Sequence, residues 1–344
     1  MSPFLDEVYA QPGALCALLA DYRGARRPAL EGALAAAGGG PLLFAGMGSS
    51  HFAALAVQAR LAAGGVRAQA WEAGELLHYH AACCTPETVL VAVSQSGESA
   101  ETLRAAQTLT RRRCLISVSN EPNSGLGRAG DVVLPLCAGA ESSISTKTYS
   151  NTLALLHLLV EGLAGQDVQA AAAALETAAG DMHDVLQRQD DVEGAADFLS
   201  GAGFLYFVAR GPALAAAHQG ALTFNEGARL PATALPGGTF RHGPFELIGP
   251  DFAAVFLAPR GRTGELTTVM AQEVAGAGGR VLLLTDGDAE PTRGLHVLPL
   301  PARGEDLFAL QACVPLELLL YHVARQRGLE AGIFRCITKV TRRE

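Results

Sequence analysis

Lysine is almost absent from this sequence. Of its 26 basic residues, only Lys147 and Lys339 are lysines, and the other 24 are arginines. A chain that uses arginine wherever a plain positive charge suffices keeps lysine where it needs a compact ammonium, or an amine that can lose its proton. Accidental survival of the two lysines is the equally weighted alternative. Both lysines are therefore candidates for a functional role.

Charge of either sign is also scarce, because charged residues make up 17% of the chain and hydrophobic residues 49%. This composition predicts sizeable buried cores and a surface made largely of small or neutral side chains. The net charge of −8 argues against a nucleic-acid groove or an anionic membrane surface as the main partner. The 344 residues suffice for about two domains.

Signals for export and for membrane insertion are missing. No stretch approaches the run of ~20 apolar residues that a membrane span needs, and the first residues lack the basic start and apolar core of a secretory signal. The seven cysteines contain no Cys-x-x-Cys pair, which favours free, buried thiols in a reducing compartment. We therefore expect a cytoplasmic protein that has no membrane partner.

Two cofactor motifs are incomplete. Gly46-Met-Gly48 resembles the start of a dinucleotide fingerprint, but His51 stands where the third glycine belongs. His78-Tyr-His80 offers two metal ligands without a third. We therefore expect no nicotinamide cofactor and no metal site.

Apolar runs recur at an interval near 163 or 164 residues, which indicates an internal duplication. The most literal repeat is Val133-Leu-Pro-Leu136, which returns as Val297-Leu-Pro-Leu300. Each run is short and continuous and alternates with helical sequence, as the strands of buried parallel sheets do. The other paired runs are 42–48 with 205–211, 89–93 with 254–258, and 114–118 with 281–285.

This duplication predicts an α/β protein of two tandem α-β-α domains, each built on a doubly wound parallel sheet. In such sheets ligands bind at the carboxyl ends of the strands, near the topological switch point. The expected parts are an N-terminal helical lead-in (1–27), a first domain (28–165), a helical connector (166–194), a second domain (195–330) and a C-terminal tail (331–344).

The loop Ser94-Gln-Ser-Gly-Glu-Ser99 follows one of these strands and opens a helix near Ala100. Its hydroxyls, its amide and the free N–H groups of the helix converge on one point, which suits a phosphate dianion without a metal or a lysine. Ordinary helix capping is the alternative, but three serines and a glutamine exceed what one cap needs. The matching loop of the second copy, Ala258-Pro-Arg-Gly261, keeps the glycine and has no hydroxyl. We therefore expect one phosphate site, in the first domain.

At Ser94–Ser99 the chain resembles the sugar-isomerase (SIS) domain family, and the likeness extends over nearly the whole chain. Within that family it is similar to the isomerase half of glucosamine-6-phosphate synthase. The matching segments are Glu7-Val-Tyr-Ala-Gln-Pro12, Gly48-Ser-Ser50, Ser145-Thr-Lys147, Glu226, Arg241-His-Gly-Pro244 and Lys339.

The resemblance implies site residues of three kinds. Glu226 falls on the catalytic glutamate, His242 on the ring-opening histidine that a neighbouring subunit donates, and Lys339 on a lysine of the C-terminal tail. The tail would then lie over the active site of a homodimer with shared active sites. The residues implied for the phosphate are Ser50, Ser94, Gln95, Ser96 and Ser99, and those for the sugar are Gly48, Ser49, Ser143 and Ser145.

Two departures from the family pattern bear on the reaction. The chain begins Met1-Ser-Pro, so we expect no glutaminase domain and no built-in source of ammonia. Thr223 replaces a lysine that assists the family glutamate. The resemblance therefore implies a sugar-phosphate isomerase whose nitrogen chemistry is open.

The chemistry of the candidate residues suits that reaction. Moving a carbonyl between C1 and C2 needs a base that shuttles a proton, an acid–base that opens the ring, and a group that stabilises the enediolate. Glu226 lies in an apolar helical stretch, and His242 lies in a loop rich in glycine and proline. A solvated helix glutamate is the alternative for Glu226. Lys339 could form an imine or neutralise an oxyanion, and Lys147 is more readily explained by packing at its own helix start.

The leading hypothesis is an enzyme that acts on a hexose or hexosamine 6-phosphate. The reaction is an aldose–ketose isomerisation, with possible loss or gain of an amino group. A deaminase/isomerase is favoured over a deglycase or an ammonia-dependent aminating isomerase. The alternative is a non-catalytic sugar-phosphate sensor, which would have no need of Glu226, His242 and Lys339 together.

Overall fold

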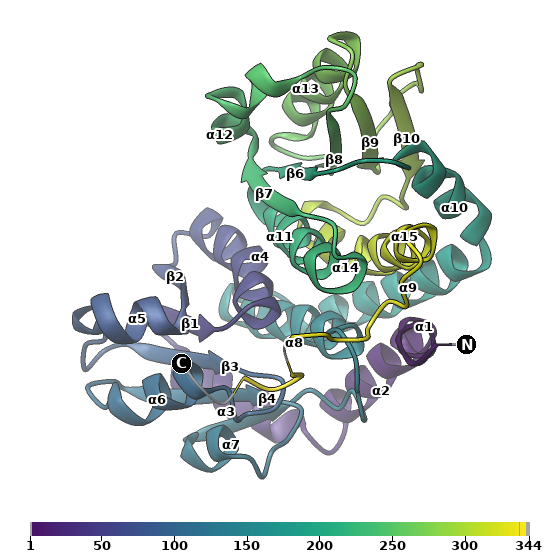
Figure 1. The fold of residues 1–344 in the computed structure, drawn as a ribbon. Helices are drawn as coiled ribbons and strands as arrows, with labels where there is room; N and C mark the ends of the chain where they lie inside the picture. The colour runs from purple at the N-terminus through teal and green to yellow at the C-terminus, as the bar shows by residue number, and fades with distance from the viewer. Residues whose placement is uncertain (1, 337, 342–344) are drawn as a thin grey trace. The chain divides into compact units, whose positions relative to one another are not determined.

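The computed structural model describes residues 2–336 and 338–341, and it contains two five-stranded parallel sheets (Figure 1). The first sheet has the strand order β2-β1-β3-β4-β5, and the second has the order β10-β9-β8-β6-β7. Reversed, the second order becomes 7-6-8-9-10, which is the first order displaced by five strands. The expected α/β fold with an internal duplication is confirmed.

The chain divides into two compact units, each of which contains one sheet. The first-sheet unit comprises Ala10–Glu141, Ser145–Ala179 and the described tail residues from 336 to 341. The second-sheet unit comprises the described residues up to Tyr9, the short segment Ser142–Ile144, and Gly180–Arg335. The chain therefore enters and leaves each unit more than once, and the domain boundaries expected from the sequence stay a prediction.

The first sheet owes its order to continuous apolar strands. All five residues of β1 and of β3 are buried, because helices cover both faces of the sheet. Helices α5, α6 and α7 share one apolar core with β1, β3 and β4, and α4, α8 and α3 lie on the other face (Figure 1). The strands are β1 (Leu42–Gly46), β2 (Ala68–Glu72), β3 (Val89–Val93), β4 (Cys114–Ser119) and β5 (Val132–Pro135). The helices are α2 (Gln11–Arg23), α3 (Arg27–Ala37), α4 (Ser49–Ala63), α5 (Ala73–Tyr79), α6 (Ala100–Thr108), α7 (Gly125–Ala129) and α8 (Lys147–Leu163).

The second sheet repeats this plan with different packing. Phenylalanines fill the core beneath α12 and α13, where the ring of Phe240 packs against those of Phe252 and Phe256. The strands are β6 (Leu205–Ala209), β7 (Ala232–Pro236), β8 (Ala253–Ala258), β9 (Arg280–Thr285) and β10 (Leu295–Pro299). The helices are α1 (Pro3–Tyr9), α10 (Gln189–Phe198), α11 (Leu214–Thr223), α12 (Gly237–Arg241), α13 (Gly264–Gly276), α14 (Phe308–Gln311) and α15 (Cys313–Gln326), and α9 (Val168–Gln187) spans the boundary between the units.

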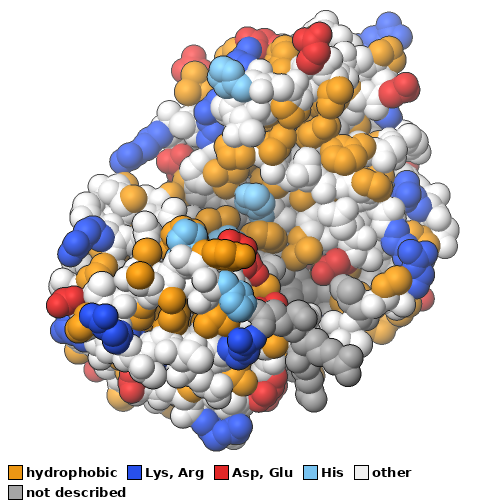
Figure 2. Space-filling view, turned by 60° about the vertical axis from the view of Figure 1, so that its left-hand side comes forward, with side chains coloured by type: hydrophobic (Ala, Val, Ile, Leu, Met, Phe, Trp, Pro, Cys, Tyr) orange, Lys and Arg blue, Asp and Glu red, His pale blue; other side chains and the backbone are white. Residues whose placement is uncertain are grey.

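One segment of the described chain, Glu305–Gln326, is long and apolar enough to cross a membrane. Within it, 94% of the most apolar window is buried inside the protein, which is the usual state of a core helix. All seven cysteines are free, as expected, although Cys16, Cys83 and Cys336 are exposed. On the face drawn in Figure 2, charged side chains are scattered among neutral and apolar ones, in keeping with the low charge content.

The turn between β3 and α6 depends on a glycine. Gly97 has φ +66°, a conformation that disfavours any side chain. A Cβ atom built there would lie 1.8 Å from Ser124 Oγ and 2.5 Å from Ser124 Cβ. The Ser124 hydroxyl is already committed, because it caps α7 by accepting a hydrogen bond from Gly127 N–H at 3.2 Å. The close approach of the two loops therefore requires glycine.

We expect Gly97→Ala to lower the stability of the first-sheet unit by more than Gly165→Ala does. Gly165 has a similar φ of +72° but nothing within 4 Å of its missing Cβ, so it controls for backbone strain alone. The clash and the loss of the Ser124 cap should add about 1 kcal/mol or more. Chemical unfolding of the two variants measures the difference, and equal midpoints would show that Ser124 yields without cost.

Candidate functional site

The candidate site lies where two neighbouring strands of the first sheet end. Gly46, the last residue of β1, pairs with Val93, the last residue of β3. The helix that follows β1 packs on one face of the sheet, and the helix that follows β3 packs on the other. The strand order reverses at this pair, which is therefore the topological switch point, where a doubly wound sheet forms a crevice between two helix N-termini. Such a crevice is the common ligand site of doubly wound sheets.

The serine loop turns tightly at this position. Ser94, which is 2% exposed, accepts a hydrogen bond from Gly97 N–H at 3.1 Å, and its Oγ lies 3.2 Å from Ser99 Oγ. Ser96 Oγ accepts from Glu98 N–H at 3.1 Å. Ser94 donates its O–H to Ser99, whereas the hydroxyls of Ser96 and Ser99 accept in these contacts and keep their own O–H groups to donate. The loop therefore presents donors on a backbone that its own serines have fixed.

The groups of the serine loop that could bind an anion are all neutral: hydroxyls, an amide and backbone N–H groups. The segment 94–99 contains no lysine or arginine, and the Glu98 carboxylate turns to Gly125 N–H at 2.7 Å. The first turn of α6 leaves backbone N–H groups without a partner inside the helix. One of them, Ala100 N–H, donates to the carbonyl of Thr341 in the tail at 3.2 Å. Hydroxyls and helix N–H groups together form an anion-binding arrangement.

The turn after β1 lies on the other side of the crevice. Gly48 (φ +49°) precedes α4, whose first residues are Ser49 and Ser50. His51 follows, and burial lowers the pKa of its imidazole, an effect that a hydrogen bond to the backbone of Trp71 partly offsets. His51 is therefore neutral at neutral pH and adds no charge to the crevice. Glu72, the last residue of β2, caps α5 by accepting a hydrogen bond from Glu75 N–H.

At the equivalent position of the second sheet, charged side chains surround the loop, whereas hydroxyls line the loop of the first sheet. The Glu305 carboxylate fills the space beside Gly261, 2.8 Å from where a Cβ would stand. Arg260 N–H donates to Asp286 at 2.5 Å, and the Arg260 guanidinium pairs with Asp288 at 2.8 Å. The loop thus has no hydroxyl to donate, its Arg260 side chain and backbone N–H are already paired, and the Glu305 carboxylate beside it repels an anion. This arrangement supports a single phosphate site, in the first-sheet unit.

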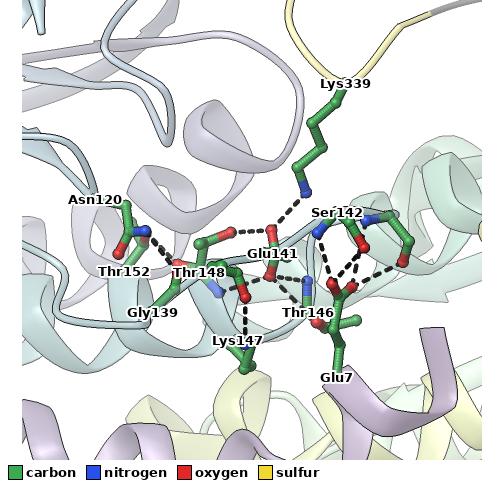
Figure 3. Close-up of polar contacts among 12 residues, drawn as sticks. Glu7, Asn120, Gly139, Glu141, Ser142, Thr146, Lys147, Thr148, Thr152 and Lys339 are labelled. Carbon is green, nitrogen blue, oxygen red and sulfur yellow. Dashed lines mark hydrogen bonds and ion pairs between the residues drawn. The ribbon is translucent and has the colours of Figure 1, made fainter. Parts of the chain in front are cut away.

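Lys339 contacts the buried carboxylate of Glu141, a residue that the sequence did not predict as part of the site. Its Nζ lies 2.6 Å from Glu141 Oε2, and the Glu141 side chain is 0% exposed (Figure 3). Glu141 also accepts four hydrogen bonds from the start of α8: the N–H and hydroxyl of Thr146 donate at 2.9 and 3.2 Å, and those of Thr148 at 3.0 and 2.7 Å. An acid just before a Ser/Thr-rich helix start was the only local signal.

The charge state of Glu141 follows from these contacts. Burial alone would raise the pKa of the carboxyl, but the Lys339 ammonium and the donors of Thr148 hold it below its usual value. Glu141 is therefore ionised at neutral pH and forms a buried ion pair. Removing one partner of such a pair typically costs 3–5 kcal/mol, or about that order, because it strands the other charge.

Lys147, the second lysine, has a structural contact. Its Nζ donates to the carbonyl of Ala140 at 2.6 Å, which ties the first residue of α8 to the preceding loop (Figure 3). This contact agrees with a packing role at its own helix start.

The two sugar-binding candidates near α8 differ in their surroundings. Ser143 is buried, and its hydroxyl donates to Glu7 at 2.9 Å within the second-sheet unit. Ser145 is half-buried and belongs to the first-sheet unit. Their assignment to the sugar stays a prediction, and so does the phosphate role of Gln95, whose carbonyl accepts from Asn120 N–H at 3.0 Å.

Glu226 lies in a single π-helical turn, Phe224–Ala228, that extends α11. Its side chain is half-buried. Turns of this kind are rare and often mark functional sites. Thr223, which stands where the family has a lysine, is buried and donates to the carbonyl of Gly220 at 3.1 Å. The hydroxyl is thus occupied by the helix and cannot replace an ammonium.

His242 is exposed at the end of α12. Its neighbour Arg241 pairs with Glu273 and lies over the ring of Phe245 at 5.0 Å, so the backbone on this side is anchored. Glu226 and His242 belong to the second-sheet unit, and the serine loop and Lys339 belong to the first-sheet unit. Among residues 2–336 and 338–341, no group of three or more His, Cys, Asp or Glu side chains could hold a metal ion.

Comparisons with known proteins agree with this architecture. The SIS domain model matches residues 40–162 and 198–325. The chain is 31% identical over 312 residues to the glutamine–fructose-6-phosphate aminotransferase [isomerizing] of Acidithiobacillus ferridurans, a match covering 87% of this chain and 51% of the relative. The chain thus spans about half the length of the curated relatives it matches.

Solved structures with the same fold extend over the whole chain. The C-terminal domain of glucosamine-fructose-6-phosphate aminotransferase from Francisella tularensis superposes with a TM-score of 0.85 at 23% identity, covering 96% of this chain and 98% of that one. A glucosamine-6-phosphate deaminase from Thermotoga maritima gives 0.79 at 20% identity, covering 98% and 99%. With two matched segments, two sheets of one topology and a serine loop at the first switch point, this chain belongs to the SIS domain family.

Proposed function

We propose that this chain is a phosphosugar isomerase that acts on a hexose or hexosamine 6-phosphate. The observation that carries the proposal is the serine loop at the switch point of the first sheet, together with the absence of hydroxyls from the matching loop of the second, Ala258-Pro-Arg-Gly261. Loss of the 2-amino group is the favoured accompanying step, which would make the protein a deaminase/isomerase. Free cysteines and the family's metabolic chemistry support a cytosolic location.

The roles of three residues follow from the reaction. Glu226 would carry the proton between C1 and C2, since a half-buried carboxylate on a π-helical turn suits a base. His242, exposed beside an anchored arginine, would open the sugar ring from a neighbouring subunit. Lys339 would act at the substrate carbonyl as an amine or as an ammonium. Together they supply the base, the acid and the charge that aldose–ketose transfer requires.

We expect fructose 6-phosphate or glucosamine 6-phosphate to stabilise the protein thermally, whereas the unphosphorylated sugars do not. Mass action gives about 2.7 kcal/mol at a hundredfold excess over the dissociation constant. Ser96→Ala combined with Ser99→Ala should abolish the shift, because it removes two donors of the loop. The same panel, run with and without ammonium in deuterated water, should show ketose formation, ammonia release and deuterium uptake.

The outcomes of that panel separate the possible functions. Equal melting shifts with and without the phosphate would contradict the serine cradle. Phosphate-dependent stabilisation without deuterium exchange on any sugar would point to a sensor and would sink the proposed isomerase.

Shared active sites in a homodimer predict complementation between inactive chains. Mixed His242→Ala and Glu226→Gln chains should recover about a quarter of wild-type activity, because half of randomly formed dimers are mixed and each has one intact site. Activity is measured after co-refolding, with the dimer fraction checked by sedimentation. A fully active monomer, or mixed dimers without activity, would exclude the shared arrangement.

Lys339→Arg should lower turnover by about a hundredfold or more, while binding of the sugar phosphate survives. Guanidinium keeps the positive charge but cannot attack a carbonyl. Lys147→Arg is the matched control, since the other lysine only donates to a backbone carbonyl. Borohydride reduction with a ketose phosphate tests for an imine on Lys339. A fully active Lys339→Arg enzyme would show that only the positive charge is needed at this position.

A further inference from the structure

The tail is fixed to the first-sheet unit at two described points. Lys339 pairs with Glu141, and the carbonyl of Thr341 accepts from Ala100 N–H, the first residue of α6. Within the tail, the Thr338 hydroxyl donates to the carbonyl of Val340 at 3.0 Å, which is a contact of the tail with itself. Thr338 and Thr341 are exposed. The two contacts hold this part of the tail, and with it the Lys339 amine, against the first-sheet unit.

Glu141 offers a fixed point for this amine. Its two oxygens accept from the backbone and the hydroxyls of Thr146 and Thr148, so its carboxylate is held by the start of a 17-residue helix. The same donors carry the positive end of the α8 dipole, which adds to the stability of the buried negative charge. Figure 3 shows the carboxylate enclosed by these groups, with only the Lys339 ammonium approaching from the tail.

The loop that carries Glu141 is connected to the phosphate loop through hydrogen bonds of Asn120. Asn120 N–H donates to the carbonyl of Gln95 in the phosphate loop at 3.0 Å. The Asn120 side chain donates to the carbonyl of Gly139 at 2.8 Å and accepts from Ala138 N–H at 2.9 Å. Two residues further along the chain stands Glu141. The position of the carboxylate is therefore set relative to the phosphate loop.

Only a carboxylate side chain can neutralise the charge of a lysine ammonium. Thr146 and Thr148 would be satisfied by any acceptor, including an amide oxygen. The buried ammonium of Lys339, which is 20% exposed, needs an opposite charge. The charge of Glu141 therefore serves the tail, whereas its hydrogen bonds serve the helix.

We infer that Glu141 is the positioning residue for Lys339. It anchors the tail in its closed place and directs the amine to the crevice where the sugar phosphate binds. The inference rests on the proposed function, since it assigns Glu141 to a reaction in which Lys339 acts at the substrate. The inference concerns the ion pair of Glu141 with Lys339, which lies within the first-sheet unit. The strength of this ion pair can be tested without measuring turnover.

The lysine content of the chain supplies the test. A protease that cleaves only after lysine has two targets, Lys147 and Lys339. Cleavage after Lys339 removes residues 340–344 and requires its side chain to leave Glu141, so the rate reports how often the tail opens. Cleavage after Lys147 requires the first turn of α8 to unfold, and reports the integrity of the unit.

Glu141→Gln should speed cleavage after Lys339 by about tenfold or more, with Lys147 still protected. Thr146→Val is the matched control, because it removes one hydrogen bond from the same carboxylate and leaves the ion pair in place. Its cleavage rate after Lys339 should match that of the wild type. In kinetics, Glu141→Gln should lower kcat about tenfold or more while the KM for the sugar phosphate stays within about twofold. Glu141→Asp, which keeps the charge on a shorter arm, should recover part of kcat.

Each outcome decides the inference. A wild-type rate of cleavage after Lys339 in Glu141→Gln would overturn it, and so would cleavage after Lys147, which would make Glu141 a determinant of the fold. If Lys339→Arg proves fully active while Glu141→Gln frees the tail, the catalytic role of the lysine fails but the anchor stands. If Lys339→Arg is inactive and Glu141→Gln keeps full kcat, the positioning role alone is wrong.

Discussion

The pairing of β1 with β3 is the constraint on which the candidate site depends. Both strands are buried over their whole length, so their register, with Gly46 opposite Val93, is fixed by the core. Because the helices that follow them leave to opposite faces, two helix N-termini face one crevice. Free N–H groups of the helices and the hydroxyls of the serine loop then converge without any charged side chain. The position of the site thus follows from the reversal of strand order between β1 and β3.

Duplication preserved this geometry in the second sheet and changed its charge. The strand order and the turn glycine persist, but Gly261 is packed against the Glu305 carboxylate, whereas Gly97 is packed against the Ser124 hydroxyl. A protein carboxylate beside that turn disfavours a substrate anion there. Identical topology therefore carries different functions, and the side chains at the switch point decide which.

Sequence reasoning succeeded where a pattern is local and failed where it is not. β3 and the start of α6 were predictable because a continuous apolar run ends at a serine-rich turn. The edge strands β2 and β7 were missed, since Ala68–Glu72 and Ala232–Pro236 are only partly buried and have no apolar run. Glu141 was missed because its partner lies 198 residues away in sequence. Lys339 was found through the scarcity of lysine, which is a property of the whole chain.

The distribution of charge in the site explains why the Lys339 ammonium is paired with a carboxylate. A free lysine on a mobile tail is drawn to the strongest anion nearby, which in a bound sugar phosphate is the phosphate dianion. In this unit the serine loop offers neutral donors for the proposed phosphate, and the ammonium is held by Glu141 through a contact of 2.6 Å. Because the amine is already paired, it does not compete with the hydroxyls for the phosphate. In the proposed reaction, a carboxylate fixed by the start of α8 therefore separates the two tasks of the site and would leave the lysine for the carbonyl end of the sugar.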